Sequence, residues 1–115
     1  MGDRANVYVV DEQEPSKGVH LYTHWAGTEL PETVRQALLR QLRWTDSQYL
    51  TRIIFDEMTK GHVGGETGFG ISFSVGDGDD RIVRVNPLTQ TVDLGHKAWP
   101  FDEYIREPRA WPEEP

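Results

Sequence analysis

Two short stretches near the start of the chain combine β-branched and aromatic residues, a composition typical of β-strands. They are Asn6 to Val10 and Gly18 to Trp25. The residues between them, 11–17, include Pro15 and four charged side chains. Since two strands separated by a short polar segment usually pair with each other, the pattern predicts a β-hairpin.

From residue 31 the apolar positions follow the period of an α-helix. Pro31 is suited to the first turn, and Val34, Leu38 and Leu42 follow at steps of four residues, which predicts a helix ending near Trp44. A second helix is expected directly afterwards, because Thr45 and Gln48 have the spacing of a capping box. Its apolar face consists of Tyr49, Leu50, Ile53, Ile54 and Met58, and Gly61 follows as a stop signal.

After residue 60 the period changes to two. Large residues alternate with small ones, the large ones being Phe69, Ile71, Phe73 and Val75, which predicts a strand with its aromatic residues facing inward. Turn residues at 76–80 and at Asn86-Pro87 separate two further strands, 81–85 and 91–94, so that we expect a three-stranded meander. Residues 100–106 are expected to form a short helix.

This element order predicts an α+β fold. We expect an antiparallel sheet of about five strands, with two consecutive helices packed on one face and a short C-terminal helix. Residues 1–106 would form a single domain. Residues 107–115 contain three prolines and three glutamates, and we expect them to form a solvated acidic tail.

Composition excludes several classes of function. The 115 residues carry a net charge of -7 and include no cysteine, so a disulfide scaffold and a cysteine-ligated metal are excluded. An acidic chain with three lysines argues against nucleic-acid binding. Because no apolar run approaches the roughly 20 residues that span a bilayer, we expect a soluble, cytoplasmic protein. No motif indicates a cofactor, and none is expected.

The second predicted strand carries the first group of candidate site residues. Alternation places His20, Tyr22 and His24 on one face and Leu21 and its alternate neighbours on the other. A zinc ion shared by the two histidines is not expected, since four residues of extended strand span about 13 Å. The three side chains are either packing residues on an open sheet face or a binding site, in which His24 would be the general acid or base.

The second group lies in residues 61–70, where five of ten residues are glycine. Glycine allows close backbone approach to a small anion, but no Lys-Ser/Thr pair follows as in a P-loop, and a flexible connection is the simpler interpretation. If this loop folds over the strand, Glu66, His24 and the hydroxyls of Ser72 and Ser74 converge in a shallow pocket floored by Gly70. The candidate binding residues are therefore His20, Tyr22, His24, Trp25, Gly65, Glu66, Thr67 and Ser72.

Several segments together resemble a family of small uncharacterised proteins of bacteria and their phages. These are residues 2–7 (GDRANV), 21–25 (LYTHW) with Leu30-Pro31 after them, 52–55 (RIIF) and 65–72 (GETGFGIS). The resemblance covers about residues 2 to 95 and implies a microbial, cytoplasmic setting, but no activity. The family has glycine where Ala26 stands in this chain.

Two functional hypotheses follow. The first is a non-enzymatic binding or interaction module that uses the His20, Tyr22 and His24 face and loop 61–70 to hold a protein or a small ligand. The second is a small hydrolase or phosphodiesterase-like enzyme with His24 as acid or base and Glu66 orienting it. The first hypothesis is favoured because the sequence shows no recognisable catalytic nucleophile with an orienting partner and no set of metal ligands. A homo-oligomer that covers the open sheet face also remains possible.

Overall fold

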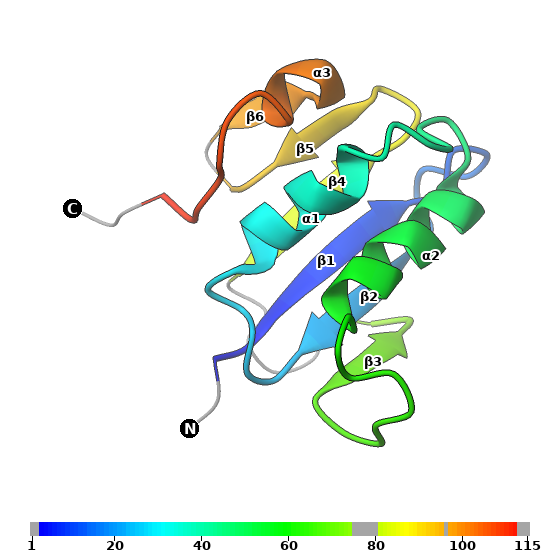
Figure 1. The fold of residues 1–115 in the computed structure, drawn as a ribbon. Helices are drawn as coiled ribbons and strands as arrows, with labels where there is room; N and C mark the ends of the chain where they lie inside the picture. The colour runs from blue at the N-terminus through cyan, green and yellow to red at the C-terminus, as the bar shows by residue number, and fades with distance from the viewer. Residues whose placement is uncertain (1–2, 75–80, 96, 113–115) are drawn as a thin grey trace.

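The computed structural model of the protein describes residues 3–74, 81–95 and 97–112. Within these ranges the chain has an α+β fold with six strands and three helices (Figure 1). In chain order the elements are β1 (Ala5–Val10), β2 (Gly18–Thr23), α1 (Leu30–Leu38), α2 (Ser47–Met58), β3 (Phe69–Ser72), β4 (Ile82–Asn86), β5 (Thr91–Asp93), β6 (Ala98–Pro100) and α3 (Phe101–Tyr104). The predicted α+β class is thus confirmed. None of these three helices is long and apolar enough to cross a bilayer.

The strands form one mixed sheet in the order β3-β2-β1-β4-β5-β6. The predicted hairpin of β1 and β2 is present, but β1 also pairs in parallel with β4, so the wholly antiparallel sheet was wrong. The predicted meander is correct only for β4 and β5, since β3 pairs with β2. A parallel pair needs a long crossover, and the segment containing α1, α2 and β3 supplies it. The predicted turn at 76–80 lies outside the described residues.

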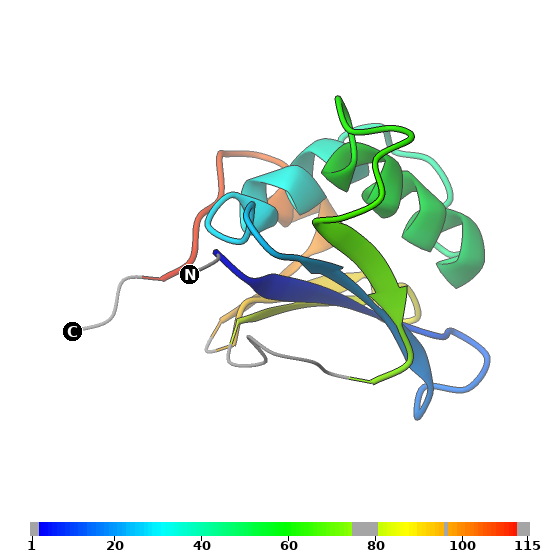
Figure 2. The same ribbon diagram turned by 90° about the horizontal axis from the view of Figure 1, so that it is seen from below.

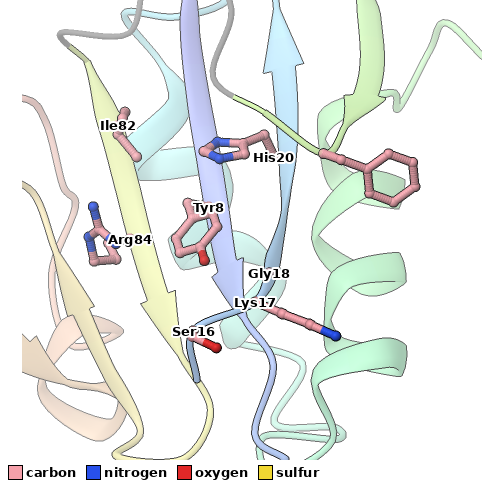
Figure 3. A pocket seen from close by; sticks show the side chains of 8 residues that line it. Tyr8, Ser16, Lys17, Gly18, His20, Ile82 and Arg84 are labelled. Carbon is pink, nitrogen blue, oxygen red and sulfur yellow. The ribbon is translucent and has the colours of Figure 1, made fainter. Parts of the chain in front are cut away.

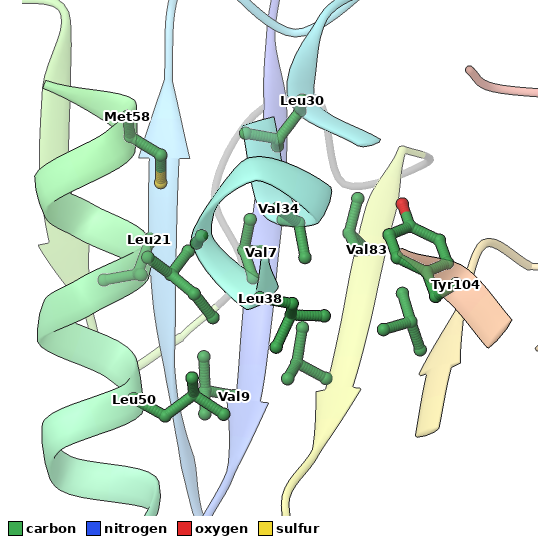
Figure 4. Packing of buried hydrophobic residues seen from close by; sticks show 14 of the residues in the cluster. Val7, Val9, Leu21, Leu30, Val34, Leu38, Leu50, Met58, Val83 and Tyr104 are labelled. Carbon is green, nitrogen blue, oxygen red and sulfur yellow. The ribbon is translucent and has the colours of Figure 1, made fainter. Parts of the chain in front are cut away.

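Helices α1 and α2 cover one face of the sheet, and the opposite face has no helix over it in the described part of the chain (Figure 2). Alternate residues of the central strands face these helices, and most are fully buried, as Figure 4 shows for part of the cluster. They include Val7, Val9, Leu21, Val83 and Val85 from the strands and Val34, Leu38, Leu50 and Ile54 from the helices. The alternation predicted for β2 therefore contributes to this core, together with the buried residues of β1 and β4.

Helix α1 is shorter than its apolar pattern predicts. It ends at Leu38, and Gln41 and Arg43 adopt left-handed backbone angles with φ of 53° and 62°. These angles cannot continue a right-handed helix. Leu42 is consequently 56% exposed and does not join the core face that its spacing predicts.

Helix α2 has the predicted C-terminal region but a different cap. The carboxylate of Asp46, rather than Thr45, accepts hydrogen bonds from the backbone N–H groups of Gln48 and Tyr49, at 3.1 and 3.2 Å. Aspartate is among the strongest N-cap residues, so the helix begins one position later than the capping-box spacing predicts.

Strand β3 is an edge strand, and of the described large residues predicted to face inward only the first packs against the core. Phe69 packs partly against the core, but Ile71 is 58% exposed and Phe73 is 91% exposed. An edge strand has a neighbouring strand on one side only, so alternation alone does not ensure burial. Val75 lies outside the described residues.

The C-terminal segment is tied to the domain as far as residue 112. The predicted short helix is reduced to α3, whose buried Tyr104 hydroxyl donates a hydrogen bond to the carbonyl of Pro31 at 2.7 Å. Farther along, Trp111 Nε1 donates to the carbonyl of Gly27 at 2.7 Å, and the Arg109 backbone N–H donates to Glu32 at 2.9 Å. The described part of the expected solvated tail therefore packs against α1 and the loop before it.

Candidate functional site

Two ring pairs occupy the helix-free face of the sheet along β2. His20 lies beside Tyr8 of β1, its partner in register, with 4.6 Å between ring centroids. Tyr22 stacks on His24 at 5.3 Å with 22° between the ring planes. His24 itself is exposed. The structure thus places the three predicted side chains along one line, but in two separate pairs.

The predicted convergence of His24, Glu66 and the serines is not formed. Glu66 is exposed and has no hydrogen bond or ion pair with any described residue. The Ser72 hydroxyl donates instead to the carbonyl of Ser74 at 2.8 Å. The structure therefore contains no carboxylate that orients His24 within its described part.

The glycines of loop 61–70 accommodate aromatic rings. A Cβ atom at Gly70 would overlap the phenol of Tyr22, and one at Gly68, where φ is +93°, would overlap the indole of Trp25. The space above Gly70, which was predicted to floor a shallow pocket, is therefore filled by Tyr22. Gly65 and Thr67 are exposed.

Trp25 belongs to a cluster of three rings beside that loop. Its ring centroid lies 5.7 Å from Phe69 and 6.2 Å from His62. The cluster borders a cavity of about 420 Å³ that also contains Asp3 and Glu57. Both of these carboxylates are already engaged in ion pairs, Asp3 with an arginine and Glu57 with an arginine and a lysine. Its lining also includes the exposed side chains of Thr28, Glu29 and His62, but it has no buried polar atom without a hydrogen-bond partner among the described residues.

A second cavity, of about 440 Å³, opens on the helix-free face of the sheet (Figure 3). We call it the open-face pocket. It lies over β1, β2 and β4, and its lining residues are Tyr8, Ser16, Lys17, Gly18, His20, Phe73, Ile82 and Arg84. Its volume is within the range of about 300–1,000 Å³ typical of small-molecule sites. Of the predicted candidates, His20 lines this pocket.

His20 is the buried polar residue of the open-face pocket. Its side chain is 7% exposed, and its Nδ1 atom is buried without a hydrogen-bond partner. Burial lowers the pKa of His20, and the positive charge of Arg84 lowers it further. The imidazole is therefore neutral near pH 7.

Two cations line the same pocket, and none of its described lining residues is a carboxylate. The Arg84 guanidinium lies over the Tyr8 ring, 5.1 Å from its centroid, and forms no ion pair with a described residue. Lys17 pairs with Glu14 at 3.4 Å, and both side chains are well exposed. The pocket therefore combines aromatic surface, one unpaired arginine and one neutral histidine.

Sequence reasoning missed Tyr8 and Arg84. Each stands between two buried valines, and this alternation already placed them on the face opposite the core. What the sequence lacked was the pairing of β1 with β4, which brings Arg84 directly beside Tyr8. Local patterns give the face of a strand but not its neighbour.

Comparison with known proteins identifies neither a family nor a function for this chain. No protein-family model, curated protein or solved structure matches this chain. The resemblance to a bacterial and phage family stays a prediction, and the function has to be argued from the site.

The shifted pKa of His20 predicts a pH dependence of stability. Because folding lowers this pKa, the unfolded chain binds a proton more readily, and stability contributed by the neutral ring is lost as pH falls below about 6.5. The His20→Phe variant should lose this component. Urea unfolding of wild type and the His20→Phe variant between pH 8 and 5 measures this component. It is the difference between the two stability curves, because the contributions of the carboxylates are the same in both proteins and cancel. Parallel curves would show that His20 titrates alike in both states.

Proposed function

We propose that this chain is a small binding protein, not an enzyme, and that it holds its ligand in the open-face pocket. One observation carries the proposal: the helix-free face has a cavity of about 440 Å³ with a buried histidine whose Nδ1 has no partner. Buried polar groups are normally hydrogen-bonded, and of the two described groups without a partner, His20 Nδ1 and Asn6 Nδ2, the one on His20 belongs to a residue that lines a cavity. The nearby Tyr22–His24 pair lies farther along β2 and borders the same face.

A small ligand fits this pocket better than a flat protein surface does. Tyr8 and Ile82 supply apolar surface, the exposed Phe73 borders the pocket, and His20 and Arg84 supply the polar groups. Few polar groups set in apolar walls are the usual composition of a small-molecule site. A protein partner that inserts one side chain into the pocket uses the same chemistry.

The hydrolase hypothesis receives no support from the geometry. It requires a carboxylate that orients His24, and Glu66 makes no hydrogen bond within the described residues. A general base normally lies within hydrogen-bond reach of its orienting group, allowing for some lengthening without substrate.

A fragment screen followed by protein-observed NMR tests the proposal. We expect the shifts caused by bound fragments to cluster on β1, β2 and β4 around Tyr8 and His20. The Tyr8→Leu variant should reduce binding at least about tenfold, because an aromatic wall is removed. Tyr49→Leu is the matched control, since Tyr49 also lies under an arginine, Arg43, but on α2. Shifts that cluster elsewhere, or equal binding by both variants, would refute a site in this pocket.

A further inference from the structure

We propose that the ligand of the open-face pocket carries an oxyanion, a carboxylate or a phosphate ester, which Arg84 binds beside His20. The inference rests on the proposed function, because it names the chemistry of a ligand for the same pocket. It is carried by the contacts and charges of three side chains, which come from three adjacent strands.

Arg84 is held in place but has no hydrogen-bond acceptor among the residues that the structure describes. The Tyr8 ring lies under its guanidinium at 5.1 Å, which fixes the position of the group. Its neighbour across the strand pair is Asp93, but Asp93 Oδ1 accepts a hydrogen bond from the Gly95 N–H at 2.7 Å, and no ion pair with Arg84 is formed among the described residues. A guanidinium with free donors matches the two oxygens of a carboxylate or phosphate.

The local charge of the pocket is opposite to that of the whole chain. Among the described lining residues are Lys17 and Arg84 but no carboxylate, whereas the chain has a net charge of -7. Glu14 neutralises Lys17 at the rim, so that Arg84 remains as the cation for a ligand. Because Tyr8 and Ile82 offer apolar surface in the pocket, the ligand is an organic anion with an apolar body, larger than a bare inorganic ion.

His20 couples binding to proton uptake. The groups that face it are Tyr8 from β1, Arg84 from β4, Ser72 opposite it on β3 and Lys17 from the turn before β2. Burial and Arg84 both keep the free imidazole neutral. An anion beside it offsets the charge of Arg84 and favours the protonated ring, which donates a hydrogen bond to the ligand. Affinity should therefore rise as pH falls toward the pKa of free His20.

Four probes test the charge and the body of the ligand separately. Benzoate and phenyl phosphate carry an oxyanion on an aromatic ring, benzyl alcohol has the ring without charge, and inorganic phosphate has the charge without the ring. Titration of the full chain by NMR should give binding of benzoate, phenyl phosphate or both, at least about tenfold tighter than benzyl alcohol and inorganic phosphate. The tighter of the two aromatic anions identifies the oxyanion.

Variants at Arg84 test the residue. Arg84→Gln should weaken binding of the aromatic anion about 10- to 100-fold, the range expected for losing charged hydrogen bonds, and Arg84→Lys should fall between. Arg52→Gln, the same change of charge at an exposed position of α2, should leave affinity unchanged. Equal binding of benzyl alcohol and benzoate, or an unaffected Arg84→Gln variant, would overturn the oxyanion while leaving a ligand pocket in place. If no probe binds while uncharged fragments bind in the pocket, only the proposal of an oxyanion ligand is refuted. If no fragment binds there either, the proposed function is refuted as well.

Calorimetry tests the part assigned to His20. In buffers of different ionisation enthalpy, wild type should take up a fraction of a proton on binding the aromatic anion near pH 7, and affinity should increase at pH 6. The His20→Phe variant should bind without proton uptake. Proton uptake that persists in this variant, or is absent from wild type, would overturn the role of His20.

Discussion

Replacing Leu21 with alanine should lower the free energy of unfolding by about 2–5 kcal/mol, the range seen for large-to-small changes in a core. The Leu21 side chain is fully buried among the residues that α2 contributes to the core. Its partner across β2 and β3 is Ile71, which faces the same side of the sheet but is 58% exposed. Ile71→Ala should therefore lower stability by less than about 1 kcal/mol. Urea unfolding of the two variants measures both losses of stability. The variants are comparable because each removes an aliphatic side chain, and the two residues are partners across β2 and β3.

Equal losses in the two variants would contradict an exposed β3 edge. They would indicate that Ile71 is covered, for example by a second copy paired along the β3 edge, which is a different interface from the homo-oligomer predicted over the open sheet face. In that case the unfolding midpoint would rise with protein concentration for wild type and not for a monomer. A concentration series of the wild-type chain therefore accompanies the experiment.

Leu21 and Ile71 show which features of a strand can be predicted from its alternating pattern and which cannot. Alternation correctly separated the core side of β1 and β2 from the side that carries His20, because a central strand has neighbours on both sides and a helix above it. For Ile71 the same rule gave the correct face of the strand and the wrong burial. Burial depends on what covers a face, and the edge position of β3 follows from pairings that join distant parts of the chain.

Helix ends were predictable where a side chain itself forms the cap. Asp46 accepts hydrogen bonds from two N–H groups of α2, and such residues are recognisable in sequence to within about a residue or two. The end of α1 had no such signal. Gln41 and Arg43 adopt positive φ although neither is glycine, so their residue types do not indicate that the helix ends before Leu42.

Only part of the candidate site was predicted from the sequence, because the rest depends on which strands lie side by side. His20 was named from the sequence, and the pocket it lines is completed by Tyr8 and Arg84 from two other strands. The net charge of the chain indicated an acidic surface. It could not show that the described lining of one cavity contains two cations and no carboxylate. Global charge bears on long-range attraction, whereas a site depends on which side chains the topology brings together.

Replacing Gly68 with alanine should lower the free energy of unfolding by about 2–4 kcal/mol, as the sum of a positive-φ penalty and a steric overlap. Gly68 has φ of +93°, and a Cβ atom there would overlap the indole of Trp25. Gly64 is the matched control, since it has φ of +87° but open space around the Cβ position. Gly64→Ala should therefore cost only about 1 kcal/mol.

Chemical unfolding measures both losses, and the fluorescence of Trp25 reports its packing, compared with a Trp25→Phe variant to remove the contribution of the other tryptophans. A larger loss at Gly68 means that this glycine makes room for an aromatic ring. That result would argue against an anion-cradling role for loop 61–70, because a backbone position covered by an indole has no space for a phosphate. Equal losses would mean that Trp25 moves aside at little cost, and the loop would then regain the freedom that its glycine content predicts.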